Sequence, residues 1–277
     1  MSERVLLAGC GDLGLRVAQR LRMRGDEVWA LRRTPPLAAD AGIHWLRADL
    51  TLAQTLHHLP AGLTQLVYLP APDRRDAGAY GALFADGLRN LLAADGMETL
   101  QRVLLVSSSA VYGEHDGAWV DEDTPTAPLA FNGSLLRDVE QWLSAQRVRS
   151  IVLRLAGLYG PGRVQLLERL RAGSVTVPRV PPHWGNRVHA DDAAEAIAHL
   201  LRLADPLALY LGVDDTPMPL DVLYDHLARL IGAPLPPAGM APANVGSKRL
   251  SNARLRASGF VPQWPDARAG YAALLGR

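Results

Sequence analysis

Near its N-terminus the chain contains the stretch Val5-Leu6-Leu7-Ala8-Gly9-Cys10-Gly11-Asp12-Leu13-Gly14. The four apolar residues predict a short buried strand, and a Gly-x-Gly-x-x-Gly pattern follows it. Residues 13–23 then repeat apolar side chains at helical spacing, at Leu13, Val17 and Leu21. The order of strand, glycine turn and helix is the context in which this pattern binds a dinucleotide. A glycine-rich turn without a ligand is the alternative interpretation.

Each position of the turn has a physical role in such a site. Gly9 permits a tight turn, Gly11 lets a pyrophosphate approach the backbone, and Gly14 lets the helix pack closely on the strand. The first helical residues, Asp12 and Leu13, stand where the helix N-terminus supplies partial positive charge. These five residues are therefore candidate cofactor-binding residues.

The second predicted strand, residues 27–31, ends without an acidic residue. NAD sites usually place a carboxylate there for the ribose 2′-OH. Arg32 and Arg33 occupy this position instead and suit a 2′-phosphate, which arginine grips in bidentate fashion. The sequence thus favours NADP over NAD, unless the two arginines are simply solvated at a strand exit. Asp49, after the third predicted strand, is either a contact for the adenine amino group or a turn residue.

Short apolar runs alternate with amphipathic segments over the first 155 residues, which predicts βαβ units and a parallel sheet. Right-handed crossovers then leave an α/β, Rossmann-like doubly wound fold. We expect residues 1–155 to form the NAD(P)-binding domain and residues 156–277 a smaller C-terminal substrate-side region, partly threaded back onto the sheet. The predicted strands are 5–8, 27–31, 43–46, 65–69, 102–106 and 150–155, and the predicted helices are 13–23, 77–94, 133–146, 192–203, 220–231, 251–257 and 267–275.

Composition narrows the class of protein. The 277 residues are 48% apolar, and 29 basic residues balance 28 acidic ones, which argues against a dedicated nucleic-acid binder. No apolar run approaches the roughly 20 residues that a membrane span needs. Cys10 is the single cysteine, so no intrachain disulfide can form, and a cytoplasmic protein is expected. We interpret Cys10 as a small loop filler. The eight histidines lack metal-ligand spacing, and no metal site is expected.

Further motifs follow in a fixed order along the chain. They are Ser107-Ser108-Ser109-Ala110-Val111-Tyr112-Gly113, Arg154-Leu155-Ala156-Gly157-Leu158-Tyr159-Gly160-Pro161-Gly162 and Val188-His189-Ala190-Asp191-Asp192. With the glycine turn, they resemble the extended short-chain dehydrogenases/reductases of the NAD-dependent epimerase/dehydratase type. The run from Lys248 to Leu255 is similar to a poorly characterised bacterial subgroup of atypical members.

This resemblance implies both a catalytic residue and a gap. In the family a Ser or Thr at the end of the fifth strand contacts substrate, and here that residue is Ser108, unless the serines only satisfy local backbone groups. A Tyr and a Lys four residues later normally transfer the proton and hold the nicotinamide ribose. Phe131 and Leu135 take these two positions, and no Tyr or Lys occurs between Gly113 and Leu158.

The resemblance also places Trp184, Asn186, Arg187 and His189 at the substrate pocket, although a structural role suits each equally. Two functions remain open. The first is an epimerase/dehydratase-like oxidoreductase that lacks the usual Tyr–Lys pair and acts on a small-molecule substrate that the sequence cannot name. The second is a non-catalytic NADP-binding sensor or regulatory protein of the same fold. A homodimer is the expected assembly, paired through residues 77–94 and 133–146.

Overall fold

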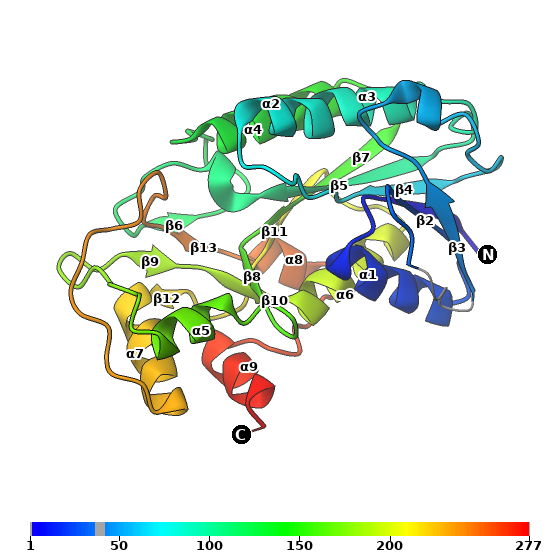
Figure 1. The fold of residues 1–277 in the computed structure, drawn as a ribbon. Coiled ribbons are helices and arrows are strands. Elements are labelled where there is room, and N and C mark those ends of the chain that lie inside the picture. The colour runs from blue at the N-terminus through cyan, green and yellow to red at the C-terminus, as the bar shows by residue number, and fades with distance from the viewer. Residues whose placement is uncertain (1, 37–41, 277) are drawn as a thin grey trace. The chain divides into compact units, whose positions relative to one another are not determined.

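The computed structural model describes residues 2–36 and 42–276. The chain forms two compact units, and it passes between them repeatedly (Figure 1). Unit 1 comprises Met1–Ser108, Phe131–Arg154 and Ala194–Leu209, and unit 2 comprises Ser109–Ala130, Leu155–Ala193 and Tyr210–Arg277.

A seven-stranded parallel sheet, in the order β11-β7-β5-β4-β1-β2-β3, confirms the predicted doubly wound α/β fold. In β1, Leu6 lies opposite Trp29 of β2 on one side and Leu66 of β4 on the other. The strand order reverses at this point, and parallel sheets bind ligands at such a switch. The strands are β1 (Arg4–Ala8), β2 (Glu27–Arg32), β3 (Ile43–Arg47), β4 (Gln65–Tyr68), β5 (Arg102–Ser108), β7 (Arg149–Leu155) and β11 (Leu209–Gly212).

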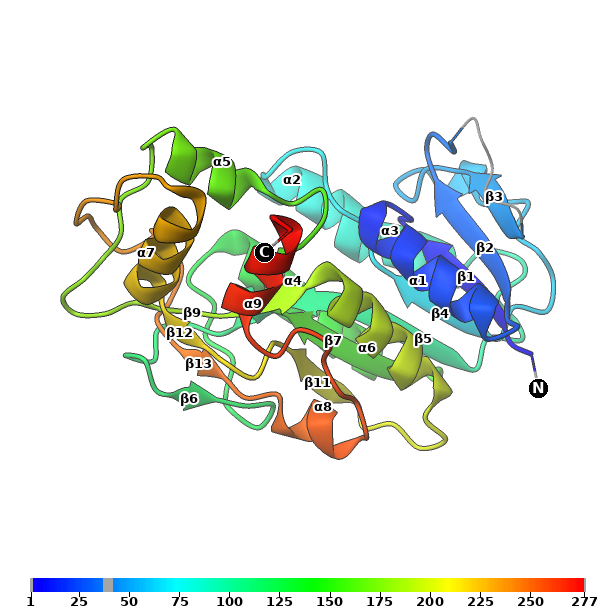
Figure 2. The same ribbon diagram turned by 90° about the horizontal axis from the view of Figure 1, so that it is seen from below.

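Helices cover both faces of the sheet in unit 1 (Figure 1). One face carries α4 (Phe131–Ser144) and a continuous helical stretch of α2 (Ala77–Tyr80), the π-helical η2 (Gly81–Asp86) and α3 (Gly87–Leu92). The other face carries α1 (Asp12–Met23) and α6 (Ala190–Arg202), which lie side by side in Figure 2. On α4, which belongs to the predicted dimer interface, the apolar side chains of Leu136, Val139 and Leu143 are buried within the chain.

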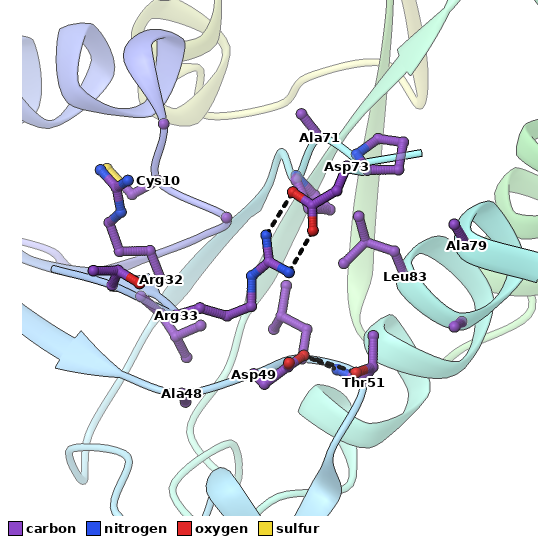
Figure 3. A pocket seen from close by; sticks show the side chains of 18 of the residues that line it. Cys10, Arg32, Arg33, Ala48, Asp49, Thr51, Ala71, Asp73, Ala79 and Leu83 are labelled. Carbon is purple, nitrogen blue, oxygen red and sulfur yellow. Dashed lines mark hydrogen bonds and ion pairs between the residues drawn. The ribbon is translucent and has the colours of Figure 1, made fainter. Parts of the chain in front are cut away.

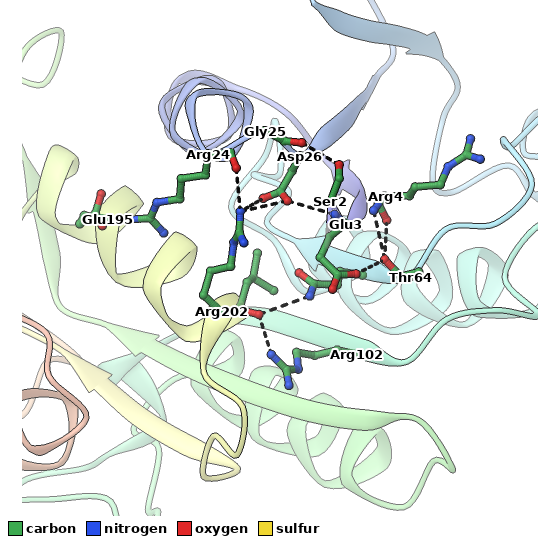
Figure 4. A network of polar contacts seen from close by, with 12 residues as sticks. Ser2, Glu3, Arg4, Arg24, Gly25, Asp26, Thr64, Arg102, Glu195 and Arg202 are labelled. Atoms are coloured by element: carbon green, nitrogen blue, oxygen red, sulfur yellow. Dashed lines mark hydrogen bonds and ion pairs between the residues drawn. The ribbon is translucent and has the colours of Figure 1, made fainter.

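A network of charges fixes the ends of α1 and α6 (Figure 4). Asp26 follows α1, and its side chain is only 1% exposed. Its carboxylate accepts hydrogen bonds from Arg202 Nη2 at 3.1 Å and from the backbone N–H of Glu3 at 3.1 Å. Arg24, at the end of α1, pairs with Glu195 of α6. The turn between α1 and β2 is thus anchored by a buried carboxylate whose charge is compensated.

Unit 2 contains three small two-stranded pairs rather than one large sheet. They are β8 (Gly157–Tyr159) with β10 (Arg187–His189), β9 (Trp184–Gly185) with β12 (Met218–Pro219), and β6 (Trp119–Val120) with β13 (Arg249–Leu250). Unit 2 also contains the helices α5 (Gln165–Arg171), α7 (Leu220–Ile231), α8 (Ala253–Ala257) and α9 (Ala267–Leu274). Two 3₁₀ turns complete the described elements, at Ala53–Thr55 in unit 1 and Ser109–Val111 in unit 2. The apolar core of unit 2 is formed by Tyr159, Leu167, Leu170, Val175, Met218, Leu223, Leu227, Ala228, Ala267 and Tyr271. Over residues 2–36 and 42–276, no helix has the length and apolar character required to cross a membrane.

Candidate functional site

A cavity of about 390 Å³ lies above the glycine turn in unit 1 (Figure 3). Its walls come from segments at the carboxyl ends of parallel strands: the turn after β1, residues 31–34, residues 48–51 and residues 70–74. Because these ends meet where the strand order reverses, the cavity stands at the usual ligand position of such a sheet. Among the residues predicted to bind a cofactor, Gly9, Gly11, Arg32, Arg33 and Asp49 line it.

The three glycines of the turn meet three different surroundings. Gly9 has φ +87°, and a Cβ atom there would lie 2.4 Å from the Cα atom of Pro70. A Cβ on Gly11 would meet nothing within 4 Å, although the residue lines the cavity. A Cβ on Gly14 would lie 3.0 Å from Cys10 Sγ. The turn therefore needs its first glycine for conformation and its third for helix packing, and it leaves open space at the second.

The remaining residues of the predicted turn sit at the start of α1. Asp12 is the first helical residue and pairs with Arg16 at 3.2 Å, while Leu13 is buried. Asp12, Leu13 and Gly14 are not among the residues that line the cavity. Burial raises the pKa of Cys10 to about 12, which leaves a protonated thiol at neutral pH and agrees with its interpretation as a loop filler.

An ion pair crosses the cavity between two of its walls. Arg33, directly after β2, donates from Nη1 to Asp73 Oδ2 at 2.5 Å and from Nη2 to Asp73 Oδ1 at 2.7 Å. Figure 3 shows this pair bridging toward the segment that follows β4. The hydrogen bonds and charge of Arg33 hold the pKa of Asp73 below its usual value. Sequence reasoning missed Asp73, although inspection of every residue that follows a strand would have found it.

Asp49 makes the turn contact considered for it, and its contact with an adenine stays a prediction. Its Oδ1 atom accepts hydrogen bonds from the backbone N–H of Thr51 at 2.9 Å and from Thr51 Oγ1 at 2.8 Å, which is a turn contact. The residue also lines the cavity, and its carboxylate lies on the same side as Arg33 (Figure 3). The turn fixes the backbone of Asp49, so its position on the cavity wall is defined.

The predicted catalytic residue, Ser108, and the two residues at the positions of the missing Tyr and Lys lie elsewhere in unit 1. Ser108 is the half-buried last residue of β5, Phe131 is the first residue of α4, and Leu135 follows one turn later. None of the three lines the cavity above the glycine turn. The Phe131 ring is 40% exposed and meets the ring of Tyr80 edge to face, with centroids 5.4 Å apart.

A buried ion pair holds α4 against the sheet. Glu140 of α4 accepts from Arg154 Nη2 of β7 at 2.6 Å, and the two side chains are 7% and 8% exposed. The hydroxyl of Ser107, in β5, donates to the same carboxylate. This contact fixes the helix that begins with Phe131 relative to the strand that ends with Ser108.

Two of the predicted pocket residues in unit 2 anchor a neighbouring segment. The backbone N–H of Trp184 donates to Ser247 Oγ at 3.0 Å. Asn186 donates from Nδ2 to the carbonyl of Lys248 at 3.0 Å and accepts at Oδ1 from the N–H of Leu250 at 2.8 Å. These contacts fix the backbone of residues 247–250.

The other two pocket candidates are also engaged within unit 2. Arg187 donates from Nη1 to the carbonyl of Asn186 at 3.0 Å. His189 is 2% exposed, accepts at Nδ1 from the N–H of Asp191 at 3.2 Å, and packs edge to face on Tyr159. His189 therefore makes structural contacts within unit 2.

Sequence reasoning did not anticipate a group of titratable residues in unit 2, of which Lys248 and His183 are buried and Glu114 is exposed. Lys248, the single lysine, is 4% exposed; its Nζ donates to the carbonyl of Gly246 at 3.1 Å, and burial lowers its pKa. Burial alone would raise the pKa of Glu114, but hydrogen bonds from backbone N–H groups, that of Ser247 foremost, lower it overall. His183 is 5% exposed, and burial lowers its pKa. In the part of the chain that the structure describes, no three His, Cys, Asp or Glu residues are grouped to hold a metal ion.

Comparisons with known proteins agree with this geometry. The family model of the NAD dependent epimerase/dehydratase family matches residues 5–208. Protein YeeZ of Escherichia coli K12 is 30% identical over an alignment of 272 residues, which covers 95% of this chain and 97% of that protein. The 3-diazoavenalumate denitrifying reductase of a Streptomyces species is 28% identical over 96% of this chain and 98% of its own length. A solved structure from Methylobacillus flagellatus, assigned as an NAD-dependent epimerase/dehydratase, is 38% identical, with a TM-score of 0.83 and coverage of 100% of this chain and 98% of that one.

Proposed function

The chain belongs to the NAD-dependent epimerase/dehydratase family, and on this premise we propose that it is an oxidoreductase with NADP as its preferred cofactor and a small molecule as its substrate. The reductase among its relatives supports the reaction class. We further propose that residues 1–155 bind the dinucleotide and that residues 156–277 form the substrate-side region.

The cavity above the glycine turn is the observation that carries this proposal. Its residues fit a dinucleotide, because a Cβ on Gly11 would meet only open space where a pyrophosphate must approach the backbone. The N-terminus of α1 presents backbone N–H groups and partial positive charge to the same anion. Arg32 and Arg33 place two guanidinium groups at the end of β2, and that of Arg33 is held by Asp73. A bound nicotinamide dinucleotide would supply the hydride donor or acceptor.

The proton-transfer step is where we propose that this chain departs from its family. Phe131 cannot donate a proton, and Leu135 cannot hold a ribose hydroxyl. Loss of a general acid or base costs about 10²–10⁴ in rate. The Ser108 hydroxyl remains as a group that can hydrogen-bond a substrate oxygen on which charge develops. A reductase built this way acts on a substrate that takes its proton from another group or from water.

A non-catalytic NADP-binding sensor is the second candidate. The apolar pair Phe131 and Leu135 favours it, since the Phe131 ring rests on Tyr80 and holds no polar atom for chemistry. The two candidates make different demands on Ser108. A Ser108→Ala change impairs an enzyme, whereas it leaves a sensor intact.

Calorimetry tests the cofactor. We expect NADP to bind the wild type more tightly than NAD, and we expect the double change Arg32→Ala with Arg33→Ala to remove this preference. Equal affinity of the wild type for both dinucleotides would refute the preference for NADP.

Turnover assays test the departure at α4. We expect little activity on the substrates of sugar-nucleotide epimerases and dehydratases, and measurable turnover after Phe131→Tyr with Leu135→Lys if the chain is a reductase that has lost its pair. Robust wild-type turnover of a common sugar nucleotide, at roughly 1–10³ s⁻¹ as in ordinary enzymes, would show that the missing Tyr and Lys are not needed.

The assembly that we propose is a homodimer paired through residues 77–94 and 133–146. Since Leu136, Val139 and Leu143 are buried within the chain, such an interface would use other side chains of these helices. Light scattering at micromolar concentration tests it, and a monomer would refute it.

A further inference from the structure

The ion pair between Arg33 and Asp73 joins two walls of the cavity (Figure 3). Arg33 follows β2, Asp73 stands in the segment after β4, and the two residues are 40 positions apart in the sequence. Both line the cavity. The pair is a two-pronged contact, with N–O distances of 2.5 and 2.7 Å. The carboxylate of Asp73 therefore contacts both terminal nitrogens of the Arg33 guanidinium, with which a phosphate would also form a bidentate contact.

The charge around this arginine is already balanced. The hydrogen bond to Asp73, and then the charges of Asp73 and Asp49, raise the pKa of Arg33. A neutral ribose 2′-OH can approach this arrangement and donate to a carboxylate. A 2′-phosphate has to displace Asp73 from Arg33 and then lie beside two carboxylates.

We propose that Asp73 reduces the preference for NADP over NAD by competing with a 2′-phosphate for the guanidinium of Arg33. This inference rests on the proposed binding of a dinucleotide in the cavity. The side chains of Arg33 and Asp73 are 57% and 65% exposed, so water screens the pair and a ligand can open it.

Asp73→Asn is the test, because it keeps the size of the side chain and removes the competing charge. We expect NADP affinity to rise roughly five- to ten-fold, the range for release of an exposed two-pronged pair plus relief of like-charge repulsion. NAD affinity should change less than two-fold. Titration of adenosine 2′,5′-bisphosphate against 5′-AMP isolates the 2′-phosphate and should show the same ratio.

Asp76→Asn is the matched control. It removes one charge from the same segment, but Asp76 pairs with Arg74 and caps α2, a role that Asn can keep. We expect this variant to retain the wild-type ratio of NADP to NAD affinity. In an Arg33→Gln background, Asp73→Asn should no longer change the ratio, since the competed group is gone.

The outcomes separate the inference from the proposed function. If the variants bind dinucleotides but Asp73→Asn leaves the ratio within two-fold of the wild type, the inference is wrong and the proposed function stands. An equal rise in Asp76→Asn would overturn it too, because general charge would then explain the effect. If no variant binds either dinucleotide while all melt as the wild type does, both the proposed function and the inference fail.

Discussion

The two units of this molecule hold their buried charges in different ways. In unit 1, Glu140 faces Arg154 at 2.6 Å and Asp26 faces Arg202 at 3.1 Å, so each buried carboxylate has an arginine partner. In unit 2, Glu122 faces Arg254 at 3.6 Å, but Asp214 is 3% exposed and its Oδ2 atom has no hydrogen-bond partner among the described residues. Compensated charges fix a structure over a wide pH range, whereas uncompensated ones titrate near neutrality.

This difference leads us to expect different responses to pH in the two units. The cavity and its glycine turn stand in the unit whose buried carboxylates are paired, which suits a site that must keep its shape before a ligand arrives. Buried groups with shifted pKa values gather at functional sites more often than elsewhere. Unit 2, with Lys248 and Asp214, is therefore the place where a substrate-dependent or pH-dependent response is expected.

The largest expected effect tests the paired carboxylates of unit 1. Glu140→Ala should lower the free energy of unfolding by about 3–5 kcal/mol, because it leaves Arg154 buried without its partner. Urea denaturation measures this loss. Glu140→Gln, which keeps an acceptor for Ser107 and Arg154, should cost less. A loss below about 1 kcal/mol would mean that the pair does not hold α4.

Gly9→Ala should have the next largest effect. Its Cβ atom would lie 2.4 Å from the backbone of Pro70, and φ is +87°. Overpacking and backbone strain together should cost about 3 kcal/mol. Gly25→Ala is a matched control, since Gly25 has φ +86° but nothing within 4 Å of its Cβ position, and it should cost about 1 kcal/mol. Equal costs at both positions would remove the packing argument for the first glycine.

Gly11→Asp should separate binding from folding in the same turn. Gly11 is the N-cap of α1 and its Cβ position is open, so Asp fits there and stability should be unchanged or slightly higher. Dinucleotide affinity should fall roughly 100-fold, because the side chain occupies the approach of the pyrophosphate and repels it. Calorimetry and thermal melting of one preparation measure both quantities. Unchanged affinity would exclude the turn as the pyrophosphate site.

The sequence predicted the parts of the molecule whose signals are local. Six of the seven sheet strands are apolar runs, and the glycine turn is a contiguous motif. β11 (Leu209–Gly212) is four residues long and α5 (Gln165–Arg171) seven, and neither stood out as a separate segment. The pairs β8–β10, β9–β12 and β6–β13 use strands of two or three residues, which are too short to show a period.

Site contacts were predictable only where both partners lay in one motif. Arg33 was found as a residue after a strand, but its partner Asp73 is 40 positions away. Glu114 and Ser247 are 133 positions apart, so no local pattern could join them. Trp184 and Asn186 were singled out because they lie just upstream of the run from Val188 to Asp192. Whether they touch a substrate stays a prediction, and each fixes the backbone of residues 247–250.

The smallest expected effect tests the buried carboxyl of Asp214 in unit 2. Burial raises the pKa of Asp214 to about 7 from 3.8, the charge of nearby Asp266 adds to the rise, and hydrogen bonds from the backbone at Thr216 and Ala267 and the charge of Arg187 oppose it. The folded state then binds more protons than the unfolded state between pH 4 and pH 7, so stability falls as pH rises through that window and is level above it.

Asp214→Asn should remove this dependence on pH. In the wild type we expect the free energy of unfolding to fall by about 2 kcal/mol across the window, less than the full pKa shift implies because neighbouring charges relax. The absolute stability of the variant is not the readout, since the new amide N–H also lacks a partner at the Oδ2 position. Asp215→Asn, at the exposed neighbour, should keep the wild-type slope. Urea denaturation at pH 5, 6, 7 and 8 provides the comparison. If wild type and Asp214→Asn run parallel across these values, the carboxyl of Asp214 does not titrate in this range and unit 2 is as well compensated as unit 1.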